Sequence, residues 1–155
     1  MTRFIPCIAI LIALTSCAQR ELSEKEKQEV ISSAREALDD YYRDIKKSGL
    51  TGELAHLDSS AEFFWTPPGY DHPISYDTVA HILRSAAPQY SLVENSFDTL
   101  RIIPLSRELA SYSAKVRSRM VDTAGNVTNL HLIETGVLIR RNRWKLLHGQ
   151  TSIIP

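Results

Sequence analysis

The sequence has 155 residues, with 18 lysines and arginines against 18 aspartates and glutamates, so its formal net charge is zero. A neutral chain offers no electrostatic basis for binding nucleic acid. Its two cysteines, Cys7 and Cys17, both lie near the N-terminus. The rest of the chain therefore has no disulfide, no thiol nucleophile and no cysteine-based metal site.

The N-terminal segment has the pattern of a signal peptide. Arg3 precedes an apolar run from Phe4 to Leu14, which is too short to span a bilayer as a mature helix. We therefore expect residues 1–16 to be removed, which leaves a single domain.

The apolar run ends in Leu14-Thr15-Ser16-Cys17, which resembles the bacterial lipobox. In lipoproteins, signal peptidase II cuts before this cysteine, and the sulfur carries diacylglycerol. The resemblance implies a lipidated Cys17 and a tether over residues 17–22. Because Ala18 is not an aspartate, resemblance to Gram-negative lipoproteins implies the periplasmic face of the outer membrane. The alternative is an ordinary signal peptide with an incidental cysteine.

Helical signals dominate the first half of the remaining chain. Ser23 and Glu26 have the spacing of a capping box, which predicts a helix that runs to about Lys47 and ends at Ser48-Gly49. Its apolar positions recur at helical spacing. They are Val30, Ala34, Ala37, Leu38, Tyr41 and Ile45. A second short helix is expected over 51–57, a short strand over 62–66, and a third helix over 76–86 before Pro88.

From Ser91 onward the apolar period changes to two, which indicates strands. Four strands are predicted, over residues 91–103, 107–122, 127–140 and 143–153. The segment 122–126 (DTAGN) and the pair Arg141-Asn142 have turn compositions and predict two hairpins.

The two hairpins predict which side chains share a face of the sheet. Two-residue turns at Ala124-Gly125 and at Arg141-Asn142 pair Lys115 with Glu134 and Thr135 with His148. The predicted inner face consists of Ala110, Tyr112, Ala114, Val116, Ser118, His131, Ile133, Thr135, Val137, Ile139, Trp144, Leu146, His148, Gln150 and Ser152. The predicted outer face carries Lys115, Arg117, Arg119, Leu130, Leu132, Glu134, Leu138, Lys145 and Leu147.

Helices followed by a long antiparallel sheet that closes on RWKLLHGQTS, residues 143–152, resemble the nuclear transport factor 2-like superfamily, which includes SnoaL-like and ketosteroid isomerase-like proteins. In SnoaL-like domains and in the association domain of calcium/calmodulin-dependent kinase, a tryptophan begins the last strand and a histidine follows four residues later, as Trp144 and His148 do here. The resemblance implies an α+β, cystatin-like cone over residues 23–155, with N-terminal helices packed on a curved antiparallel sheet.

The same resemblance implies a cavity between the first helix and the inner sheet face. The expected ligand-binding residues are Tyr41, Tyr42, Trp65, Tyr112, His131, Thr135, His148 and Gln150. It also implies a homodimer through the outer face, for which we expect Leu130, Leu132, Leu138 and Leu147. The alternative to a dimer is that a terminal segment covers these leucines, or that they are scattered among charged residues.

The case for catalysis is weaker. Ketosteroid isomerase-like members use a carboxylate base near the end of the first strand, and the matching residue here, Thr66, is not a base near neutral pH. His148 is the one candidate acid or base, with Thr135 as its expected neighbour and no carboxylate predicted on the inner face. The sequence has no pair of histidines at a spacing typical of metal ligands, and we expect no cofactor.

Three functions stay open. The favoured one is a lipid-anchored periplasmic module whose cone-shaped pocket binds a small, partly apolar molecule or contacts a partner protein. The others are a non-catalytic structural homodimer and a SnoaL-like hydrolase, isomerase or dehydratase that uses His148 as acid or base.

Overall fold

A computed structural model describes residues 21–155. The predicted signal peptide and Cys17 lie outside the described residues. The helices and strands are α1 (Glu24–Ser48), η1 (Leu50–Ala55), β1 (Phe64–Thr66), α2 (Tyr76–Ala86), η2 (Ala87–Gln89), β2 (Tyr90–Pro104), β3 (Leu109–Asp122), β4 (Val127–Arg140) and β5 (Trp144–Ile153). All the elements expected from the sequence are present, and the second short helix is a 3₁₀-helix.

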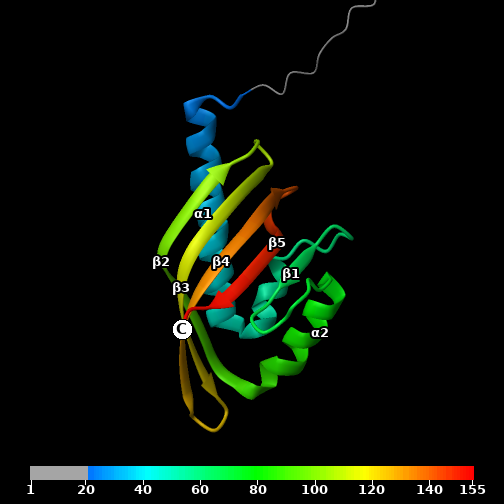
Figure 1. The fold of residues 1–155 in the computed structure, drawn as a ribbon, viewed down its shortest axis with the longest axis vertical. Helices are drawn as coiled ribbons and strands as arrows, with labels where there is room; N and C mark the ends of the chain where they lie inside the picture. The colour runs from blue at the N-terminus through cyan, green and yellow to red at the C-terminus, as the bar shows by residue number, and fades with distance from the viewer. Residues whose placement is uncertain (1–20) are drawn as a thin grey trace, which may run out of the picture.

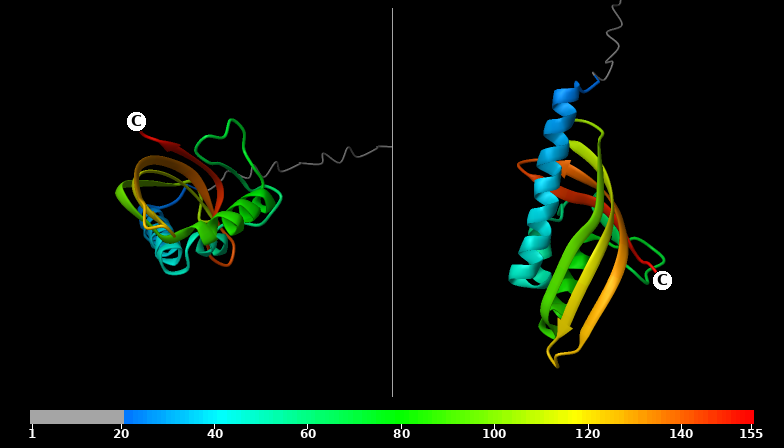
Figure 2. Two further views of the ribbon diagram at one scale, coloured as in Figure 1. Left: turned by 90° about the horizontal axis from the view of Figure 1, so that it is seen from below. Right: turned by 90° about the vertical axis from the view of Figure 1, so that its left-hand side faces the viewer.

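The strands form one curved sheet in the order β1-β5-β4-β3-β2, and α1 lies along one face of it (Figure 1). Figure 2 shows the long strands curling around that helix. The expected α+β architecture is confirmed, with one addition. The short strand β1 pairs in parallel with β5, so the sheet is mixed, although the pairings of β2 with β3, β3 with β4 and β4 with β5 are antiparallel.

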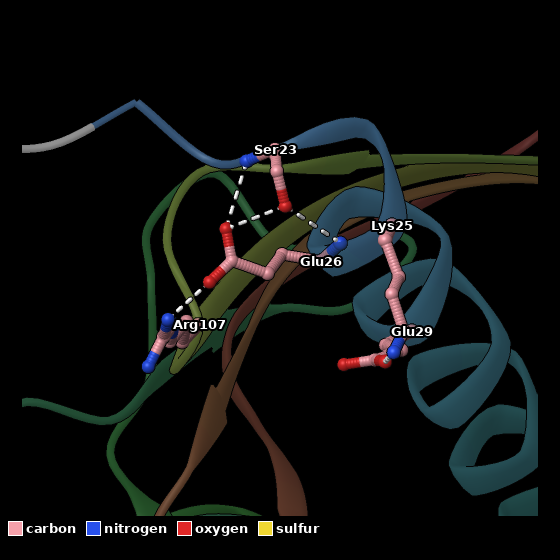
Figure 3. A network of polar contacts seen from close by, with 5 residues as sticks. All are labelled: Ser23, Lys25, Glu26, Glu29 and Arg107. Carbon is pink, nitrogen blue, oxygen red and sulfur yellow. Dashed lines mark hydrogen bonds and ion pairs between the residues drawn. The ribbon is translucent and has the colours of Figure 1, made fainter.

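The predicted capping box starts α1. The Ser23 Oγ accepts a hydrogen bond from the Glu26 backbone N–H at 3.4 Å, and the Glu26 carboxylate accepts one from the Ser23 backbone N–H at 2.8 Å (Figure 3). Arg107, in the turn between β2 and β3, also pairs with Glu26. This network ties the start of the helix to the sheet beneath it.

The turn between β3 and β4 differs from the predicted one. The Asp122 N–H bonds to the carbonyl of Asn126, which leaves a three-residue loop whose last member, Gly125, has φ +89°. The Asp122 carboxylate accepts hydrogen bonds from the backbone N–H groups of Ala124 and Asn126, both at 2.8 Å. One extra loop residue moves the pairing by one position, so Ala114 lies opposite Glu134 and not Thr135.

The turn between β4 and β5 is also one residue longer than predicted, because Arg140 pairs with Trp144. An irregularity between Val137 and Leu138 shifts the register again, so His148 lies opposite Val137. Trp144 and Leu146 therefore stay on the inner face, as predicted, whereas the second half of β5 changes face.

These shifts correct the assignment of β4. Its inner face carries Leu132 and Leu138, which are 8% and 2% exposed, together with Glu134. Leu130 lines the interior and Leu147 is buried, so the four leucines predicted for a dimer surface do not form an outer patch. The inner residues of β3, by contrast, are as predicted. Ala110, Tyr112, Ala114, Val116 and Ser118 are all buried.

Replacing Gly125 with alanine tests the turn that sets this register. A side chain at φ +89° is strained, so we expect Gly125→Ala to lower the free energy of unfolding by about 1–2 kcal/mol in urea denaturation. Ala124→Ser changes the neighbouring loop position, where φ is not positive, and is expected to leave stability nearly unchanged. Equal stability of Gly125→Ala and the native protein would contradict this account of the turn.

Candidate functional site

A cavity of about 190 Å³ lies between α1, η1 and the inner face of the sheet. Its apolar wall consists of Ile45, Leu50, Pro68, Val93, Met120, Leu130, Leu132 and Leu146. Its aromatic and polar residues are Tyr41, Tyr42, Glu53, Trp65, Asn95, Tyr112, Ser118, Glu134, Gln150 and Thr151. A mostly apolar wall with a few convergent polar groups is typical of a small-molecule site.

The first carboxyl group of the cavity belongs to Glu53, which is 7% exposed. The short helix η1 approaches α1 closely at Gly52, where a Cβ atom would lie 2.4 Å from the carbonyl oxygen of Asp44. Only glycine allows this approach, which brings Glu53 inside. The Tyr41 hydroxyl on α1 donates a hydrogen bond of 2.5 Å to Glu53 Oε1.

The second carboxyl group belongs to Glu134, which β4 turns inward because of the register described above. The Tyr42 hydroxyl donates a hydrogen bond of 2.7 Å to Glu134 Oε2. The Tyr42 ring stacks on Phe97 of β2 with ring centroids 4.5 Å apart, which fixes its direction. Two consecutive tyrosines of α1 therefore hold two carboxyl groups from different elements.

Burial controls the ionisation of these groups. It raises the pKa of Glu53 from 4.5 to about 7; the hydrogen bond from Tyr41 opposes the shift and the charge of Glu134 adds to it. Burial also raises the pKa of Glu134, and the hydrogen bond from Tyr42 opposes that shift. Near neutral pH, Glu53 is therefore poised between its acid and its carboxylate form.

Further polar groups complete the site. The Trp65 indole N–H donates to Thr151 Oγ1 at 3.2 Å, so β1 and β5 are joined beside the cavity. Asn95 Oδ1 is buried and has no hydrogen-bond partner among the described residues. The buried Tyr112 faces the same space from β3. A buried acceptor without a partner is costly in a folded protein and indicates room for a donor that residues 21–155 do not supply.

Five of the eight predicted ligand-binding residues line this cavity. They are Tyr41, Tyr42, Trp65, Tyr112 and Gln150. Gln150 is exposed and borders both the cavity and a shallow groove beside Pro68. Thr135 and His131 are exposed and lie on the outer face, because the β4 register differs from the predicted one by one residue.

His148 also lies away from the cavity. Its ring stacks on Phe64 with centroids 4.0 Å apart, and its Nε2 is 3.1 Å from the backbone oxygen of Glu62. The predicted pairing of His148 with Thr135 is wrong, since Gln150 lies opposite Thr135. His148 therefore joins β5 to the β1 edge of the sheet and contributes nothing to the cavity wall.

The sequence interpretation missed both carboxyl groups, although each had a signal. Leu50, Glu53, Leu54 and Leu57 have the spacing of one helical face, which places Glu53 among leucines. Glu134 shares the alternation of Leu130, Leu132 and Leu138 in β4. Assigning these leucines to the core in preference to the mixed set of His131 and Thr135 would have turned Glu134 inward.

Residues 21–155 hold no group of three or more histidine, cysteine, aspartate or glutamate side chains arranged to bind a metal ion. No helix in this part of the chain has the length and apolar character that crossing a membrane requires.

No protein-family model matches the sequence, and no curated protein is significantly similar to it. Solved structures are similar over most of the chain. A nuclear transport factor 2-like superfamily protein from Salmonella enterica serovar Typhimurium has a TM-score of 0.70 at 16% identity, covering 83% of this chain and 93% of its own. The chain has the nuclear transport factor 2-like fold.

Two proteins that are named for an activity also have this nuclear transport factor 2-like fold. A ketosteroid isomerase-like protein from Erwinia carotovora has a TM-score of 0.65 at 16% identity, covering 82% of this chain and 98% of its own. A type 2 hexachlorocyclohexane dehydrochlorinase has a TM-score of 0.68 at 12% identity, covering 86% and 90%. At these identities the likeness establishes the fold alone, because one fold supports many functions.

The raised pKa of Glu53 predicts a pH-dependent stability. The folded protein keeps the Glu53 proton up to about pH 7, whereas the unfolded chain releases it near pH 4.5. Stability is therefore lost as pH rises through this window, by about 3 kcal/mol from this group. In urea denaturation, Glu53→Gln should lack this loss, whereas Glu36→Gln, an exposed change on α1, should follow the native curve. Parallel curves for Glu53→Gln and the native protein would contradict it.

Proposed function

We propose that residues 23–155 form a small-molecule-binding domain whose ligand occupies the cavity beneath α1. The main support for this proposal is that Tyr41 and Tyr42 hold the carboxyl groups of Glu53 and Glu134 inside a largely apolar space. Apolar walls provide the affinity for an organic body, and the fixed polar groups orient it.

The size of the cavity limits the ligand. A volume of about 190 Å³ is below the roughly 300–1,000 Å³ of sites for drug-sized molecules, and it equals roughly six water molecules. A ligand with a single ring or a short chain fits this space. The favoured class is thus a small, partly apolar metabolite.

Acid–base catalysis is the second candidate, and Glu53 favours it. A buried carboxyl with a pKa of about 7 suits proton transfer at neutral pH, and the hydrogen bond from the Tyr41 hydroxyl holds it in position. The dehydrochlorinase and the ketosteroid isomerase-like protein of the same fold support an isomerase or lyase class for this candidate. The version that relied on His148 loses its basis, because His148 contacts Glu62 and Phe64.

The homodimer expected through the outer face of the sheet stays a prediction, with other residues than the four leucines. Ile133, which is 42% exposed on the outer face, is an apolar residue that a second copy would have to cover. The leucines first expected there face the interior or are buried. A dimer is compatible with ligand binding, since the cavity lies on the opposite side of the sheet.

Filling the cavity tests the proposed function. We expect Leu130→Trp, which places an indole in the cavity, to weaken by at least tenfold the binding of any compound found by ligand-observed NMR in a screen of small ring and short-chain metabolites. Ile133→Trp adds the same group to the outer face of the same strand and should bind as the native protein does. The proposal fails if no compound binds, or if both variants bind equally. Turnover of a bound compound, lost in Glu53→Gln, would identify the enzyme.

We further propose that this domain is held by an acylated Cys17 at the periplasmic face of a bacterial outer membrane. The support is the lipobox-like sequence Leu14-Thr15-Ser16-Cys17 after an apolar run. Cells grown with a clickable palmitate analogue should label the native protein and Cys7→Ala, but not Cys17→Ala. Labelling of Cys17→Ala, or its absence from the native protein, would refute lipid anchoring while leaving the cavity proposal intact.

A further inference from the structure

We infer that the ligand of this cavity is an organic cation, a small amine with an apolar body whose ammonium group lies between Glu53 and Glu134. The inference rests on the proposed binding function and adds the chemical class of the ligand. It is argued from the charge, the hydrogen-bonding capacity and the aromatic lining of the cavity.

Among the described residues, the side chains that can bring charge to the cavity near neutral pH are acidic. Two carboxyl groups face it, and among residues 21–155 no lysine, arginine or histidine lines it. The ring centroids of His56 and Tyr41 are 5.4 Å apart, but His56 does not line the cavity. Its Nε2 is paired with the Asp44 carboxylate at 2.8 Å. Buried carboxylates are stable only when they are paired, so a cation must come from the ligand or the groups must take up protons.

The cavity also contains hydrogen-bond acceptors that residues 21–155 leave unpaired. The hydroxyl protons of Tyr41 and Tyr42 are already donated to Glu53 Oε1 and Glu134 Oε2. No hydrogen bond among the described residues uses the other carboxylate oxygens, and Asn95 Oδ1 has no partner. The cavity thus presents several free acceptors from three elements, η1, β2 and β4. An ammonium group, which has up to three N–H donors and no acceptor, complements this set.

The aromatic lining suits the same ligand. Tyr41, Tyr42, Trp65 and Tyr112 come from three elements and all line the cavity. Aromatic faces attract organic cations, and more strongly when the site is desolvated. The apolar side chains of Met120, Leu130 and Leu132 then contact the body of the ligand. The volume of about 190 Å³ fits an amine with one ring or a short chain.

The ionisation of the site makes binding depend on pH. The groups that face Glu53 and Glu134 are Tyr41 and Tyr42 from α1 and Tyr112 from β3, whose own pKa values are raised by burial, so these tyrosines stay neutral. Only the carboxyl groups change charge in the accessible range. Acidification protonates them and removes the partner of the ammonium group, so an amine should bind more weakly as pH falls below 7.

Matched pairs of compounds test this inference on the native protein. Benzylamine and benzyl alcohol have nearly the same shape, as do hexylamine and hexanol, and each pair differs in charge. Isothermal titration calorimetry at pH 8 should give a dissociation constant at least tenfold lower for the amine in one or both pairs. At pH 5.5 the amine should lose at least tenfold in affinity, whereas the binding of the alcohol should change little.

Variants locate the effect. The double change Glu53→Gln and Glu134→Gln should abolish the preference for the amine, and Glu62→Gln, an exposed carboxylate outside the cavity, should keep it. Thermal unfolding of each variant reports whether it is folded, and the pH comparison on the native protein does not depend on them. An alcohol that binds as tightly as its amine overturns the cation inference but supports the binding function. Binding of neither pair overturns the inference, and the Leu130→Trp screen then decides the binding function separately.

Discussion

The hydrogen bonds from Tyr41 and Tyr42 to Glu53 and Glu134 are the contacts on which the interior of this protein depends. A carboxyl group moved from water into an apolar space loses hydration, and a hydrogen bond from a fixed donor offsets part of that loss. Neighbouring positions on a helix point about 100° apart, so one tyrosine reaches η1 and the next reaches β4. A single helix thereby organises carboxyl groups from two distant parts of the chain.

This arrangement constrains the backbone at two glycines. Gly52 lets η1 approach α1 closely enough for Glu53 to face Tyr41. Gly125 adopts φ +89° in the loop whose length decides whether Glu134 or Thr135 faces inward. At both positions a local backbone requirement places a chemical group in the cavity. The site is therefore built by the turns as much as by the residues that line it.

The fold was predictable from the sequence to a much greater extent than the site. Periodicity, capping and turn residues located all the major elements, because these signals act within a few residues. Choosing between two- and three-residue loops in DTAGN depends on whether Gly125 takes a left-handed conformation, and the composition is compatible with both. That one choice turned β4 over, so His131 and Thr135 replaced Leu132 and Glu134 in the prediction. The helix face that carries Tyr41 and Tyr42 was independent of it and was placed correctly.

The buried carboxyl groups also bear on the choice between a functional cavity and a structural core. A core under selection for stability alone gains from apolar side chains of similar size, because replacing buried charged or polar networks with well-packed hydrophobic residues is often neutral or stabilising. Residues 21–155 keep Glu53, Glu134 and an Asn95 Oδ1 without a partner among them in one space that their side chains do not fill. Three destabilising features in one cavity are difficult to explain by packing. They are expected of a site whose polar groups are completed by a bound molecule.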